Sequence, residues 1–180
     1  MDFDGYDTLT LSNDEKNLLG TLRRLSDMDK VEYAAAVSGS WVSDCFTDYQ
    51  PNGVRIPPEI HALNNFALYH AHTNKTLLSV QDLRLLLNPQ IMKIVVITSD
   101  RNVCAASVGN GYRPDSDEFA LAVKQIQRSI DMSLLDVPNF FQWTKEERFA
   151  YYTMEQCYQI ARSFDWRIEG GDCCVSESIL

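Results

Sequence analysis

Hydrophobic positions recur with two different periods along the chain, and these periods predict where helices and strands lie. Apolar residues at helical spacing follow Ser12-Asn-Asp-Glu15, a capping-box pattern, so we expect a helix from there to about Met28. Two-residue alternation or a continuous apolar run predicts strands at 30–42 (with a bend at Gly39), 54–56, 66–72, 91–98 and 103–108. The first half of the chain therefore mixes strands with a leading helix.

Turn-forming and helical segments separate these strands and follow them. Turns are expected at 50–53 and 99–102, a short helix after Pro57-Pro58, a loop at 73–78 and a helix at 79–87. Two longer helices are expected at 115–135 and after a second capping box, Thr144-Lys-Glu-Glu147. A return strand is expected at 164–168, whereas residues 1–11 and the tail from Gly170 are expected to be loose.

This order of elements favours an α+β fold or a mixed three-layer α/β/α sandwich, with a central mixed sheet of at least four strands flanked by helices. We expect a single domain over residues 1–180, with a core at about 12–110 and a helical C-terminal extension at 115–168 packed on it. The aromatic residues of the extension are interpreted as core packing, with a recognition surface as the alternative.

Composition and charge exclude several classes of function. Of the 180 residues 45% are hydrophobic, which is typical of a globular protein, and no apolar run approaches the ~20 residues of a membrane span. A net charge of −9 argues against a nucleic-acid partner. The five cysteines include no Cys-x-x-Cys motif, and the acidic N-terminus lacks a signal-peptide pattern, so we expect reduced thiols and a cytoplasmic protein.

Two of the three histidines, His70 and His72, end the apolar strand predicted at 66–72. Side chains two residues apart in a strand point to the same face, so both imidazoles are expected together. Asp82 follows in Ser79-Val-Gln-Asp82, at the start of the next helix. Two imidazoles and a carboxylate are the ligands of a catalytic Zn²⁺ that keeps a fourth position for water. The alternative is purely structural, since Ser79-x-x-Asp82 is also typical of a helix N-cap.

A hydrolase built on such a metal also needs a general base. Glu32 is the first candidate, because it stands among apolar residues near the start of the first long strand. Glu59 is the rival candidate, but it follows Pro57-Pro58 and is better explained as a charge at a helix N-terminus.

Glu32, His70-x-His72 and Ser79-x-x-Asp82, in this order, resemble the JAMM motif of the Jab/MPN-domain zinc metalloproteases. The residues around the motif are more similar to bacterial or phage-like members than to eukaryotic ones. The resemblance covers roughly residues 30–108 and includes the interval from Glu32 to Gly39. It departs from the family where Thr73 replaces the usual proline, and the loop before Ser79 is one residue shorter than usual.

The resemblance implies a Jab/MPN-like sandwich of the cytidine-deaminase type, with His70, His72 and Asp82 as zinc ligands. It also implies that Glu32 acts as the base on a zinc-bound water and that Ser79 donates a hydrogen bond to the oxyanion. The implied activity is hydrolysis of isopeptide or peptide bonds by a deubiquitinase-like enzyme that acts on a protein such as ubiquitin or a ubiquitin-like protein. Two alternatives stay open: a non-catalytic protein-binding scaffold of the same fold, and a zinc amidohydrolase of small substrates.

Overall fold

The computed structural model describes residues 6–50, 53–109, 111–134, 137 and 140–172. Its seven strands are β1 (Asp7–Thr8), β2 (Tyr33–Ser38), β3 (Trp41–Val42), β4 (Phe66–Ala71), β5 (Ile91–Ile97), β6 (Asn102–Ser107) and β7 (Arg167–Asp172). The α-helices of the described ranges are α1 (Asn13–Asp29), α2 (Val80–Leu85), α3 (Ser116–Ser133) and α4 (Lys145–Ser163). Two 3₁₀ helices, η1 (Ile60–Ala62) and η3 (Phe140–Gln142), complete the set described.

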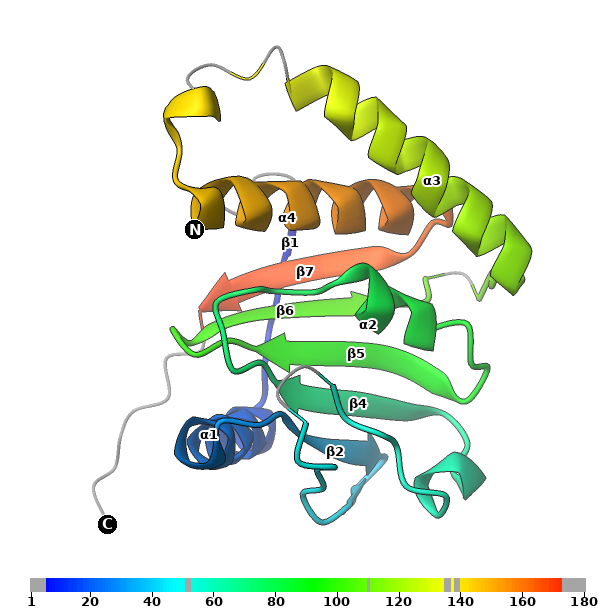
Figure 1. Ribbon diagram of the computed structural model, residues 1–180. Helices are drawn as coiled ribbons and strands as arrows, with labels where there is room; N and C mark the ends of the chain where they lie inside the picture. Colours follow the sequence, from blue (N-terminus) through cyan, green and yellow to red (C-terminus); the bar gives the residue numbers. More distant parts are fainter. Residues whose placement is uncertain (1–5, 51–52, 110, 135–136, 138–139, 173–180) are drawn as a thin grey trace.

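All seven strands form one mixed sheet, in the order β1-β7-β6-β5-β4-β2-β3 (Figure 1). β4 runs parallel to β5, and β1 runs parallel to β7, while the remaining neighbours are antiparallel. The helix α2 lies in the crossover between the parallel strands β4 and β5, as such a connection requires. The expected mixed α/β architecture is therefore confirmed, with more strands than the sequence predicted.

Two buried hydrophobic clusters lie on opposite faces of this sheet. On one face Leu19 and Leu22 of α1 pack on alternate residues of the central strands, such as Tyr69 and Val95. On the other face α2 and α4 pack on Phe66, Leu68, Ile94 and Val96, and Phe119 of α3 joins the same cluster. In Figure 1 α4 runs beside β7, and α3 packs against α4. The sheet thus forms the middle layer between helices on both faces.

The helix starts follow the local sequence closely. Ser12 and Glu15 form a reciprocal capping box at α1, as predicted, and Thr144 and Glu147 do so at α4. These caps satisfy backbone N–H groups that the first helical turn leaves without a partner, so a short local motif is enough to fix where each helix begins.

Three predictions about strands are corrected by the structure. Residues 54–56 form no strand; the isolated bridge nearby joins Gln50 and Gly53, before that segment. The segment expected as one strand at 30–42 is a hairpin, because Gly39 turns the chain with a φ of 60°. The return strand begins at Arg167 rather than Phe164 and continues to Asp172, past the point where we expected a loose tail.

The N-terminal segment is the fourth correction. Asp7 and Thr8 pair with Glu169 and Gly170, so β1 closes the edge of the sheet where residues 1–11 were expected to be loose. A two-residue strand carries no hydrophobic period, so the sequence offers no signal for it. Residues 51–52 of the predicted turn and the rest of the tail, 173–180, lie outside the described residues.

Two further expectations concern the cysteines and the membrane. Cys45, Cys104 and Cys157 are free thiols, and the Cys173-Cys174 pair lies outside the described ranges. No helix in the described part of the chain combines the length and the apolar character that crossing a bilayer requires.

Candidate metal centre and catalytic cleft

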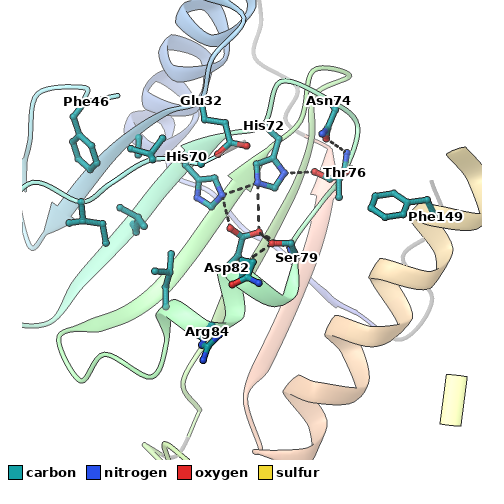
Figure 2. A pocket seen from close by; sticks show the side chains of 17 residues that line it. Glu32, Phe46, His70, His72, Asn74, Thr76, Ser79, Asp82, Arg84 and Phe149 are labelled. Carbon is teal, nitrogen blue, oxygen red and sulfur yellow. Dashed lines mark hydrogen bonds and ion pairs between the residues drawn. The ribbon is translucent and has the colours of Figure 1, made fainter. Parts of the chain in front are cut away.

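The C-terminal end of β4 and the N-terminal end of α2 bring His70, His72 and Asp82 together (Figure 2). His70 lies in β4 and His72 directly follows it, and their neighbours Tyr69 and Ala71 pack on the opposite face against the α1 cluster. The two-residue period of the strand therefore turns both imidazoles towards α2, as the sequence predicted.

The three side chains are close enough to hold one metal ion. His70 Nε2 lies 3.1 Å from Asp82 Oδ1 and 3.0 Å from His72 Nε2, and His72 Nε2 lies 3.7 Å from Asp82 Oδ2. Their ligand atoms lie within 4.8 Å of one another, and all three residues are at most 8% exposed. The structure therefore contains a buried His-His-Asp group that could bind a metal.

The backbone of the 73–78 loop fixes how His72 presents its ring. Nδ1 of His72 lies 2.5 Å from the carbonyl oxygen of Thr76, which can only accept a hydrogen bond. The proton of a neutral His72 is therefore on Nδ1, and the lone pair of Nε2 points at the site. The side chain of Asn74 holds the loop in turn, since its Oδ1 accepts a hydrogen bond of 2.7 Å from the Thr76 amide. The sequence did not signal either contact.

We expect Asn74→Ala to lower the affinity of this group for added Zn²⁺ by about tenfold, because the loop that orients His72 loses its internal hydrogen bond. Asn74→Asp keeps an acceptor oxygen at the same place and serves as the control, with an expected change below about threefold. Competition titrations against a zinc chelator measure both variants. Equal affinities in wild type and Asn74→Ala would contradict this role of the loop.

Asp82 is held by the cap of its own helix. The backbone N–H and the hydroxyl of Ser79 both donate to Asp82 Oδ2, each over 2.7 Å, and Ser79 Oγ accepts from the Asp82 amide at 3.2 Å. Ser79-x-x-Asp82 is thus a capping box, and the structural interpretation of the motif is confirmed. The cap and a metal site do not exclude each other, because the reciprocal cap leaves Asp82 Oδ1 directed at His70.

The electrostatics of the three residues suit a bound cation. Burial alone raises the pKa of Asp82, but His70, His72 and the Ser79 hydroxyl outweigh it and hold that pKa well below its usual range. Burial lowers the pKa of His70, yet the carboxylates of Asp82 and Glu32 raise it overall. Burial and the neighbouring His70 lower the pKa of His72. The site therefore favours a single positive charge between the Asp82 carboxylate and the two imidazoles, either a proton on His70 or a bound cation.

The three ligand atoms also fit a zinc ion, because their lone pairs face one point. His72 Nε2 and Asp82 Oδ1 both act as acceptors. Without a metal, the N–H at Nε2 of His70 is therefore the donor that they share. A divalent cation would replace that proton and meet three lone pairs at once. His70 Nδ1 is buried and has no hydrogen-bond partner among the described residues, so no protein acceptor opposes the exchange of the Nε2 proton for a cation.

Glu32 reaches the same cleft from the neighbouring strand. It immediately precedes β2, whose Ala34 lies opposite His70 of β4, so Glu32 faces the histidine side of the sheet (Figure 2). Glu32 is only 8% exposed, and burial together with the Asp82 carboxylate raises its pKa to about 7, although His70 opposes the shift. A carboxylate with a pKa near neutrality can both accept and return a proton. Glu59, the rival base, is exposed beside η1 and is not among the residues of the cleft.

The cleft around these residues has a volume of about 420 Å³. Its lining includes apolar side chains such as Phe46, Val54 and Leu85, and the exposed ring of Phe149 lines the cleft from α4. Because Phe149 is far from the motif in sequence, its place in the cleft was not predicted. The arrangement offers an apolar surface for a substrate beside the polar residues that could act on it.

Comparisons with protein-family models, with curated proteins and with solved structures found no match to this chain. The function must therefore be argued from the geometry of the cleft.

Proposed function

We propose that this protein is a zinc-dependent hydrolase of isopeptide or peptide bonds with a catalytic centre of the JAMM type. The observation that carries the proposal is the buried His70-His72-Asp82 group with Glu32 in the same cleft. The mixed sheet with helices on both faces is compatible with the Jab/MPN-like fold that the motif suggests. The experiment that tests it combines metal analysis of the purified protein with a panel of di-ubiquitin and ubiquitin-like substrates.

The proposed chemistry divides between the ligands and two other side chains. A zinc ion held by His70, His72 and Asp82 would polarise the scissile carbonyl and lower the pKa of a water at its open position to about 7. Glu32 takes a proton from the attacking water and returns it to the leaving nitrogen, which its raised pKa allows. A substrate seated against the apolar lining of the cleft would displace water from the reacting groups.

Ser79 is proposed to stabilise the oxyanion. Its hydroxyl donates to Asp82 Oδ2 in the present arrangement, so it must turn away from Asp82 to reach a substrate oxygen. Asp82 would stay in place during this rotation, because the backbone N–H of Ser79 holds the same oxygen at 2.7 Å. The cap can thus release its hydroxyl without releasing the metal ligand.

We expect Ser79→Gly to separate the two roles of this residue. Glycine is a tolerated N-cap, so the free energy of unfolding should fall by only a few tenths of a kcal/mol. Loss of an oxyanion donor should lower the rate of hydrolysis by about 10²-fold or more. Thermal unfolding and single-turnover rates measure the two effects, and Ser79→Thr, which keeps the hydroxyl, is the control. An active Ser79→Gly enzyme would reduce Ser79 to a helix cap.

A non-catalytic scaffold and a small-amide hydrolase remain the competing functions. The scaffold needs neither a metal-binding group nor a buried base, whereas here the buried carboxylate of Glu32 lines the same cleft as the three candidate ligands. This observation favours an enzyme. The substrate panel separates a protein substrate from a small amide.

A further inference from the structure

A second groove lies along α4, outside the metal centre, and has a volume of about 590 Å³. Its floor is one face of the helix, where Glu147, Tyr151, Glu155 and Tyr158 recur at helical spacing. The N-terminal segment and the turn between β5 and β6 form the other side. We call this the α4 groove, and its size is within the range of about 300–1,000 Å³ that is usual for ligand sites.

Four aromatic rings line the α4 groove as two contacting pairs. Tyr6 stacks on Tyr158 with 5.7 Å between ring centroids, and Trp143 meets Tyr151 edge to face at 5.4 Å. The hydroxyl of Tyr6 donates to the Met154 carbonyl on α4, which fixes the N-terminal segment against the helix. Because the Arg162 guanidinium already lies 5.7 Å from the Tyr158 ring centroid, the pair Trp143–Tyr151 carries the cation–π part of the argument for a further cation.

Three carboxylates stand among these rings, and each is oriented through one hydrogen-bonded oxygen. Asp100 Oδ1 accepts from Thr98 at 2.5 Å, Glu155 Oε1 accepts from Gln159 at 2.6 Å, and Glu147 Oε2 accepts from Thr144 at 2.8 Å. Their other oxygens have no hydrogen bond or ion pair within the described residues, and no lysine or arginine lines the groove.

We propose that the α4 groove binds lysine or arginine side chains of a protein partner. Charge complementarity selects this occupant, because oriented carboxylates beside aromatic faces attract a cation twice, through ion pairs and through cation–π contacts. An anionic or purely apolar segment would leave the three carboxylates desolvated without a counter-charge. This assignment does not rest on the proposed hydrolase activity.

Two segments of the chain, α4 and the Asp100 turn, connect the α4 groove to the metal centre. Phe149 of α4 lines the catalytic cleft, whereas the next two residues, Ala150 and Tyr151, line the α4 groove. The turn that carries Asp100 is joined to the loop of the metal site, since the Ser99 amide donates to the Asn74 carbonyl at 3.1 Å. A partner bound by its basic residues in the groove would therefore lie beside the cleft.

The test is titration of the full chain with an acetylated and amidated peptide, Gly-Ser-Lys-Gly-Lys-Ser-Gly, followed by calorimetry and by NMR amide shifts. We expect saturable binding that weakens as salt is added, with shifts confined to α4, the Asp100 turn and the segment around Tyr6. The same peptide with norleucine for lysine should not bind. No binding of the lysine peptide, or shifts located elsewhere, would overturn the proposal.

Two matched double variants separate the groove from the general acidity of the protein. Glu147→Gln with Glu155→Gln should weaken binding about fivefold to thirtyfold, because two exposed ion pairs are lost while the helix cap accepts glutamine. Asp14→Asn with Asp117→Asn removes the same charge from exposed sites on α1 and α3 and should change the affinity less than twofold. Equal loss in both double variants would mean attraction by net charge alone and would refute a built site.

Two further measurements address the rings and the source of the cation. Trp143→Leu should weaken binding of the lysine peptide roughly two- to fivefold, as expected for a lost cation–π contact. Spermine in place of the peptide tests whether a free polyamine is the ligand. If spermine binds the groove and the peptide does not, the assignment to a protein partner is wrong.

Discussion

On the proposed function, Glu32→Gln should abolish detectable hydrolysis and leave zinc binding intact. The glutamine fills the same space in the cleft but cannot take a proton from water, so the rate should fall by about 10²–10⁴-fold. Glu32 is not one of the three grouped ligands, and the metal content should therefore remain at about one ion per chain. Single-turnover kinetics and metal analysis of the same preparation measure both quantities.

Glu59→Gln is the matched control for this prediction, since it removes the same charge from an exposed residue outside the cleft. Its activity should stay within about twofold of the wild type. Loss of activity in the Glu59 variant together with full activity in the Glu32 variant would reassign the base. Loss of zinc in the Glu32 variant would instead indicate that Glu32 is a ligand.

The second large effect is expected from His70→Ala and Asp82→Asn, which should each lower the zinc affinity by more than about 100-fold, the upper end of what loss of an outer-shell contact costs. With only three protein ligands, the loss of one leaves too few to hold a metal tightly. Each of these substitutions removes or neutralises one of the three buried side chains. Asparagine is chosen at position 82 because it keeps an oxygen for the cap at Ser79. Metal analysis and chelator competition measure the loss.

Thermal unfolding gives an independent measurement of the same site. With free zinc at 100 times the wild-type dissociation constant, binding adds about 2.7 kcal/mol to the free energy of unfolding, and in both variants this gain should fall to about 0.4 kcal/mol or less. His61→Ala is the control, because His61 is exposed in η1 and does not line the cleft. Stoichiometric zinc in the His70 and Asp82 variants would show that the metal site has been assigned wrongly.

Local sequence determined much of the helical structure and part of the candidate site. The starts of α1 and α4 could be predicted because a capping box is satisfied within four consecutive residues. The shared direction of His70 and His72 could be predicted because it depends only on the period of one strand. Asp82 joins them because the loop after the strand is short and the next helix begins at its end.

Tertiary structure decided what depends on residues distant in sequence. The β1 strand, the extent of β7 and the absence of a strand at 54–56 follow from which backbones pair, and pairing leaves no local signal when strands are short. The place of Phe149 in the cleft and the joining of Tyr6 and Asp100 along α4 follow from packing on the sheet. The sequence by itself therefore indicated which residues could bind a metal and favoured Glu32 over Glu59 as the base, whereas only the fold placed Glu32 in their cleft and opened the groove next to them. The reason is physical: caps and strand periods are satisfied within a few residues, but clefts are made by contacts between segments that meet only after the chain has folded.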